Sequence, residues 1–163
     1  MGTIQFVLSI IAVFLGVLGG FLLSWIAPEE LLPGRKYFMF AKKLLLSVIL
    51  ILFVYSLQLL LGYEILLVAL VILLVIIAPL KARIFYPLTA LVLVLSLSQP
   101  NLFLVQAVLV FVYGMIISTI YCSSFIKKES FTETPGRILI KLILRYISFL
   151  IVGIAAYLIL LLI

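Results

Sequence analysis

Long apolar segments, each close to the length that a helix needs to cross a lipid bilayer, most restrict what this chain can fold into. A hydrocarbon core of about 30 Å requires about 20 predominantly apolar helical residues. Hydrophobic residues make up 68% of the 163 residues and charged residues only 10%, whereas soluble domains are typically about 45–50% apolar and about 25% charged. We therefore expect an all-α polytopic integral membrane protein, with residues 1–163 forming a single membrane domain.

Six apolar segments are predicted to be transmembrane helices, arranged as three helix hairpins. The predicted spans are 4–27, 44–61, 65–80, 84–98, 102–125 and 146–163. The fourth span, 84–98, would cover only about 22 Å at about 1.5 Å per residue. It could therefore be either a re-entrant segment or a short full crossing.

The positions of the basic residues predict the orientation of these spans. All 11 Lys and Arg residues lie in the links after the first, third and fifth predicted spans. Because basic residues accumulate on the cytoplasmic side of membrane proteins, we expect these links inside and both termini outside, in a prokaryotic cell membrane. The same rule favours a full crossing by 84–98, since otherwise the basic fifth link would lie outside.

A Pro-Gly-Arg motif occurs twice, at 33–35 and at 135–137, and each copy is expected to open a helix. Eight residues after the Arg of each copy stands another base, Lys43 or Arg145, which directly precedes an uncharged apolar segment. These two bases are predicted to mark the inner edge of the hydrocarbon. The motif indicates either a repeated structural element or only the usual end of a helix near a basic membrane surface.

The stretches 34–43 and 135–145, which follow the two motifs, are predicted to be interfacial helices. In the first stretch, Lys and Arg residues are expected on one helix face and the aromatic residues Tyr37, Phe38 and Phe40 on the other. The basic residues are either contacts for anionic lipid headgroups on the cytoplasmic side or topology signals alone. The candidate headgroup contacts are Arg35, Lys36, Lys43, Arg137, Lys141 and Arg145.

Two rows of small residues spaced four apart predict close helix packing. The first span carries Ala12, Gly16 and Gly20, and the fifth carries Gly114 and Ser118. Small residues let two helices approach closely, so that van der Waals contact replaces the missing hydrophobic drive. We expect the two rows to pack against each other within one molecule; the alternative is that one row forms the contact between two copies of the chain.

Three polar residues of the outer half, Gln58, Glu64 and Gln106, are candidates for a polar pocket that opens outward. The alternative is that the two glutamines form hydrogen bonds between helices and that Glu64 is a hydrated turn residue.

The composition argues against most catalytic chemistry. The sequence contains no His, and Cys122 is the single Cys; an imidazole base, the usual zinc sites and a disulfide within the chain are therefore excluded. We expect no enzymatic activity, no cofactor, no metal and no nucleic acid partner. The predicted function is that of a non-enzymatic membrane subunit or scaffold, which packs its helices against other membrane subunits or a second copy. The alternative is a small transporter or channel for an apolar, lipid-like or small uncharged solute.

Overall fold

The computed structural model describes residues 3–61, 82–126 and 134–162, and every element within these ranges is helical. The all-α class predicted from the sequence is thus confirmed for the described residues. In chain order the elements are α1 (Thr3–Ile26), α2 (Pro28–Leu61), α4 (Ala82–Leu95), the short 3-10 helix η1 (Ser96–Ser98), α5 (Pro100–Ile126), α6 (Pro135–Tyr146) and α7 (Ser148–Leu162).

Several of these helices are compatible with an integral membrane protein. In the described part of the chain, four stretches are long and apolar enough to cross a membrane: Thr3–Ile26, Pro33–Ser56, Pro100–Phe125 and Pro135–Leu162. The predicted span 84–98 corresponds to a shorter apolar helix, Phe85–Ser98. The predicted span 65–80 lies outside the described residues.

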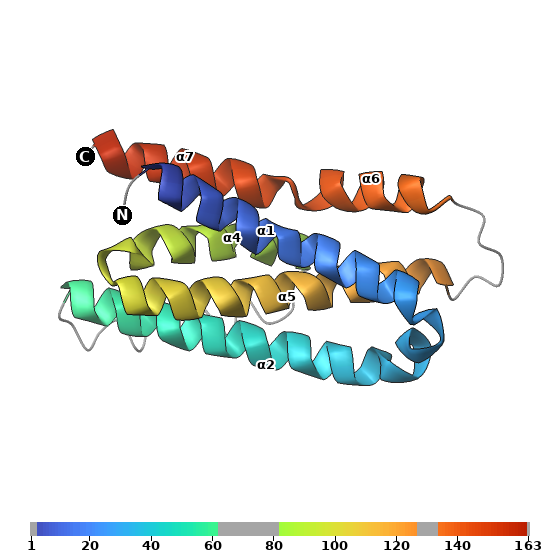
Figure 1. Ribbon diagram of the computed structural model, residues 1–163. Helices are drawn as coiled ribbons and strands as arrows, with labels where there is room; N and C mark the ends of the chain where they lie inside the picture. Colours follow the sequence, from blue (N-terminus) through green and yellow to red (C-terminus); the bar gives the residue numbers. More distant parts are fainter. Residues whose placement is uncertain (1–2, 62–81, 127–133, 163) are drawn as a thin grey trace.

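The helices lie side by side in an elongated bundle (Figure 1). Helices α1 and α5 run in the same direction, because Gly16 lies against Phe111 and, one turn later, Gly20 lies against Met115. Helix α7 runs the opposite way along α1, so that the start of α1 meets the end of α7. The Phe6 ring of α1 stacks on the Tyr157 ring of α7 with 4.2 Å between their centroids.

The ends of the helices form two groups (Figure 1). The start of α1, the end of α7 and the turn between α4 and α5 lie at one end of the bundle. The turn between α1 and α2, the end of α5 and the start of α6 lie at the other end. The basic Pro-Gly-Arg segments near the starts of α2 and α6 therefore occupy the same end of the molecule.

The expectation that Pro33 opens the second helix is wrong. Helix α1 ends at Ile26 and α2 begins at Pro28, so Ala27 alone joins them and the stretch 28–43 is helical throughout. The Glu30 backbone N–H donates to the Ala27 carbonyl at 3.3 Å, which starts the helix before Pro33. Pro28 suits a first helical position, and the negative charge of Glu29 beside it interacts favourably with the positive, N-terminal end of the helix dipole. The predicted interfacial helix 34–43 is therefore not a separate helix but lies within the first half of α2.

The second motif behaves as expected, since Pro135 opens α6. The stretch 135–145 does form a helix of its own, because α6 ends at Tyr146 and α7 begins at Ser148. The interruption at Ile147 is small: its N–H donates to the Ile143 carbonyl at 2.8 Å, and its own carbonyl accepts from the Ile151 N–H at 3.2 Å. Helices α6 and α7 therefore follow one another closely along the bundle.

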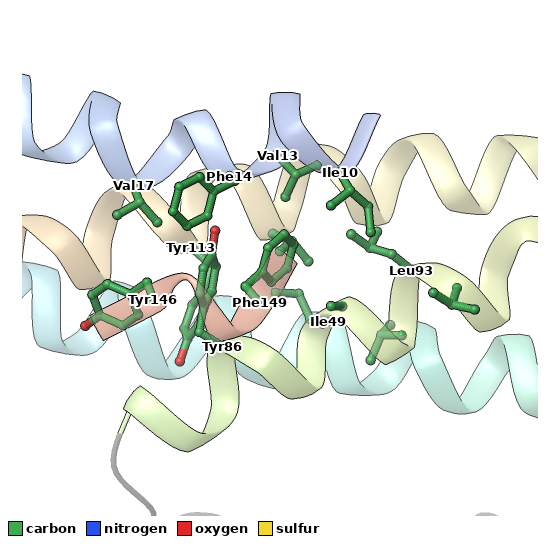
Figure 2. Packing of buried hydrophobic residues seen from close by; sticks show 14 of the residues in the cluster. Ile10, Val13, Phe14, Val17, Ile49, Tyr86, Leu93, Tyr113, Tyr146 and Phe149 are labelled. Atoms are coloured by element: carbon green, nitrogen blue, oxygen red, sulfur yellow. The ribbon is translucent and has the colours of Figure 1, made fainter. Parts of the chain in front are cut away.

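Aromatic side chains fill the centre of the bundle. Tyr86 of α4 stacks on Phe149 of α7 at 4.5 Å between centroids and meets the edge of Tyr146 at 5.6 Å. Tyr113 of α5 lies 6.3 Å from Tyr86. Figure 2 shows these rings together with aliphatic side chains of α1, and all four rings are buried. The core thus joins α1, α4, α5, α6 and α7, and Ile49 of α2 belongs to it as well.

Candidate functional site

A close helix contact joins α1 and α5 through two glycines. A Cβ atom added to Gly16 would collide with the Phe111 carbonyl oxygen, and one added to Gly20 would collide with the Met115 carbonyl oxygen. Only glycine permits this approach. The Thr119 hydroxyl of α5 donates to the Met115 carbonyl oxygen of its own helix at 2.8 Å and shares this hydrogen bond with the Gly20 carbonyl oxygen at 3.2 Å. This bond adds a polar contact to the van der Waals packing of the two backbones.

The structure brings part of the two small-residue rows together. Ser118 lies against Gly20, so these members of the two rows meet directly. Gly114 faces Val17 of α1 and the Tyr86 hydroxyl of α4 instead. Ala12 is exposed on the outside of the bundle. The small residues of α1 therefore lie on two different surfaces. Gly16 and Gly20 are covered by α5, whereas Ala12 lies on an open surface.

The open surface is a groove of about 500 Å³ between α1 and α5. Three small residues line it, Ser9, Ala12 and Ala107. The Ser9 hydroxyl donates to the Gln5 carbonyl of its own helix at 2.8 Å, so it already has a hydrogen-bond acceptor. The remaining lining residues are apolar: Val13, Phe103, Leu104, Val108 and Phe111.

The candidate polar pocket is described only at Gln106. This side chain is fully buried, and neither of its amide atoms has a hydrogen-bond partner among the described residues. Glu64 and the side chain of Gln58 lie outside the described part of the structure. The pocket therefore stays a prediction.

The hydroxyls of Tyr86 and Tyr113 are also buried without a partner in the part of the bundle that the structure describes. A buried polar group without a hydrogen bond typically costs about 1–3 kcal/mol. No sequence pattern marks these two tyrosines as neighbours, because they come from different helices.

Three of the four basic residues of α2 line a second groove. Arg35, Lys36 and Lys43 share a space of about 530 Å³ with Met39 and Phe40. The expectation that Phe40 lies on the opposite face from the bases is wrong. At 100° per residue, Phe40 stands only about 60° beyond Lys43 around the helix, so a wide groove includes both. Sequence reasoning missed Met39, although its position between the bases on the helical wheel could have indicated it.

The basic residues of α6 have different surroundings. Arg137 and Lys141 are exposed. The Arg145 guanidinium carbon lies 4.8 Å from the centroid of the Tyr121 ring, within the range of a cation–π interaction, and 6.0 Å from that of Tyr146. Its Nε is buried and finds no hydrogen-bond partner among the described residues. The predicted headgroup contacts therefore divide into a groove on α2, two exposed bases on α6, and one base held by aromatic rings.

No protein-family model, no curated protein and no solved structure matches this chain. Its function is therefore inferred from its own residues.

Proposed function

We propose that the protein is a non-enzymatic integral membrane subunit or scaffold that packs against a helix of a membrane partner. The groove between α1 and α5 is the observation that carries this proposal. Small side chains line part of it, and the apolar side chains of Leu104 and Val108 beside them are 66% and 57% exposed. A transmembrane helix laid along such small residues would gain close van der Waals contact without burying a polar group.

The neighbouring contact within the chain supports this use of the groove. Ala12 lies one helical turn before Gly16, where the backbone of α5 already packs closely on α1. At Ala12 the same row of small residues faces outward. In this row, Gly16 therefore contacts α5, whereas Ala12, one turn earlier, is available to a helix of another protein.

The aromatic centre of the bundle favours this role over the alternative of a small transporter or channel. A solute would have to pass between the helices, and Tyr86, Tyr113, Tyr146 and Phe149 occupy the centre of the described bundle. Moving these rings would break the stacking of Tyr86 on Phe149, which joins α4 to α7.

We further propose six membrane spans in three hairpins, with both termini on the outer side of a prokaryotic cell membrane. The start of α1 and the end of α7 lie at one end of the bundle, as an even number of crossings requires (Figure 1). The basic starts of α2 and α6 lie at the other end, which suits the cytoplasmic side.

Site-specific photo-crosslinking in native membranes tests the scaffold proposal. A photoreactive residue at Leu104, in the groove, should give one discrete protein adduct, identified by peptide sequencing. A photoreactive residue at Ile51, which is 58% exposed on α2, is the control and should give lipid adducts.

Filling the groove should remove the Leu104 adduct. Ala12→Leu should abolish it, whereas Ala155→Leu, at an exposed alanine of α7, should leave it unchanged. Lipid adducts alone at Leu104 would contradict the scaffold role.

A further inference from the structure

The groove on α2 combines positive charge with exposed apolar side chains. Arg35, Lys36 and Lys43 line it together with Met39 and Phe40. From Arg35 to Lys43 the helix rises about 12 Å, at about 1.5 Å per residue. The three cations are thus spread along one wall of a single groove of about 530 Å³.

The charges of the groove favour an anionic ligand. Three bases and no described acidic side chain line it. A guanidinium can hold two oxygens of a phosphate at once, and the ammonium groups of lysine add point charges beside it. A phosphate group therefore fits the groove.

The apolar part of the groove requires more than a free anion. Phe40 is 68% exposed and Met39 39% exposed, directly beside the cations. Large apolar side chains next to bases are typical of surfaces that reach the boundary between lipid headgroups and acyl chains. A phospholipid supplies both a phosphate for the bases and a chain for Phe40, whereas inorganic phosphate supplies only the first.

We propose that this groove, lined by Arg35, Lys36, Met39, Phe40 and Lys43, binds the phosphate headgroup of an acidic phospholipid, with the upper part of an acyl chain against Phe40. This site does not depend on the proposed scaffold role, because it lies on α2, away from the groove between α1 and α5. It also singles out one set of bases, since Arg145 of α6 already lies over the Tyr121 ring.

Lipid titration of the purified full-length chain, followed by native mass spectrometry, tests the site with phosphatidylglycerol as the probe and phosphatidylcholine as the reference. Arg35→Gln should weaken phosphatidylglycerol binding about fivefold, and removal of all three charges should weaken it about a hundredfold. Phosphatidylcholine binding should change little. The preference for phosphatidylglycerol should fall as the salt concentration rises.

Two variants distinguish binding in this groove from nonspecific attraction of acidic lipid to any exposed base. Arg137→Gln removes the same charge from an exposed position on α6, outside the groove, and should weaken phosphatidylglycerol binding clearly less than Arg35→Gln does. Phe40→Ala should weaken phosphatidylglycerol binding although no charge is lost. Equal losses for Arg35→Gln and Arg137→Gln would overturn the site and leave only nonspecific attraction.

Inorganic phosphate distinguishes the two sources of the same chemistry. If millimolar inorganic phosphate displaces phosphatidylglycerol and Phe40→Ala has no effect, the groove takes free phosphate and the lipid proposal is wrong. Lys36→Gln, at an exposed position, replaces Arg35→Gln as the decisive variant if the latter does not fold. Wild-type affinity in a folded Lys36→Gln protein would then also count against the proposal.

Discussion

The two Pro-Gly-Arg segments share a sequence pattern but not an environment. In α2, no residue from 33 to 44 whose side chain is described is buried, and three of the four bases line an outward groove. In α6, Ile138, Leu142 and Tyr146 are buried, and Arg145 lies over an aromatic ring. The same motif is therefore followed by bases in an open groove in one place and by a helix packed on the core in the other.

The difference follows from the neighbours of each helix. The buried residues of α6 are spaced four apart and form one stripe, with which the helix packs into the aromatic core. The equivalent stripe of α2 holds Lys36, Phe40 and Leu44. Two of these three are large and apolar, yet Phe40 and Leu44 are exposed. An apolar stripe alone thus does not determine whether a helix is packed.

The largest effect on stability is expected at the centre of the buried stripe of α6. Leu142 is fully buried, and Leu142→Ala should lower the free energy of unfolding by about 2–5 kcal/mol through the cavity it leaves. Phe40→Ala, at the equivalent position of the first copy, should change stability by less than about 0.5 kcal/mol. Reversible unfolding of both variants in mild detergent measures the two effects; similar losses would mean that the first copy is packed as well.

A smaller difference in stability is expected between Arg145 and Lys43, the bases eight residues after the Arg of each motif. Arg145→Gln removes the cation–π contact with Tyr121 and should cost about 0.5–2 kcal/mol. Lys43→Gln, at an exposed position, should cost about 0.5 kcal/mol or less.

A double-mutant cycle isolates the contact of Arg145 with Tyr121. Tyr121→Leu should cost clearly less in the Arg145→Gln background than in the wild-type protein, because residues in contact are energetically coupled. Additive losses would show that the ring does not stabilise the base.

The smallest effect concerns the two glycines of the motif. A Cβ atom at Gly136 would meet nothing within 4 Å, whereas one at Gly34 would lie 3.2 Å from the Phe38 ring. Gly136→Ala should therefore stabilise the protein by about 0.4–1 kcal/mol, because alanine costs less backbone entropy in a helix. Gly34→Ala should give a smaller gain, since Phe38 has to move. Melting temperatures check both, and an equal gain at both positions would show that Phe38 yields freely.

The sequence predicted the helical class and much of the outline of the helices. Apolar length alone located 4–27 and 102–125, which fall within α1 and α5 apart from one residue. It misplaced the start of α2, because a Pro followed by two acidic residues outcompeted Pro33 as a helix start. The glycines of the first span were recognised as packing residues, but nothing in the sequence indicated that Ala12, in the same row, would face outward.

Apolar length and charge placement are local properties, so the sequence by itself determined that the chain forms long apolar helices with bases gathered near the starts of α2 and α6. The contacts of each base depend on residues far away in the sequence. Tyr121, which holds Arg145, lies on α5, and the core that receives Leu142 is built from several helices. Only the tertiary structure decided that Arg145 is held by aromatic rings while Arg35 lines a groove, because the partners of a side chain depend on which helices come to lie beside it.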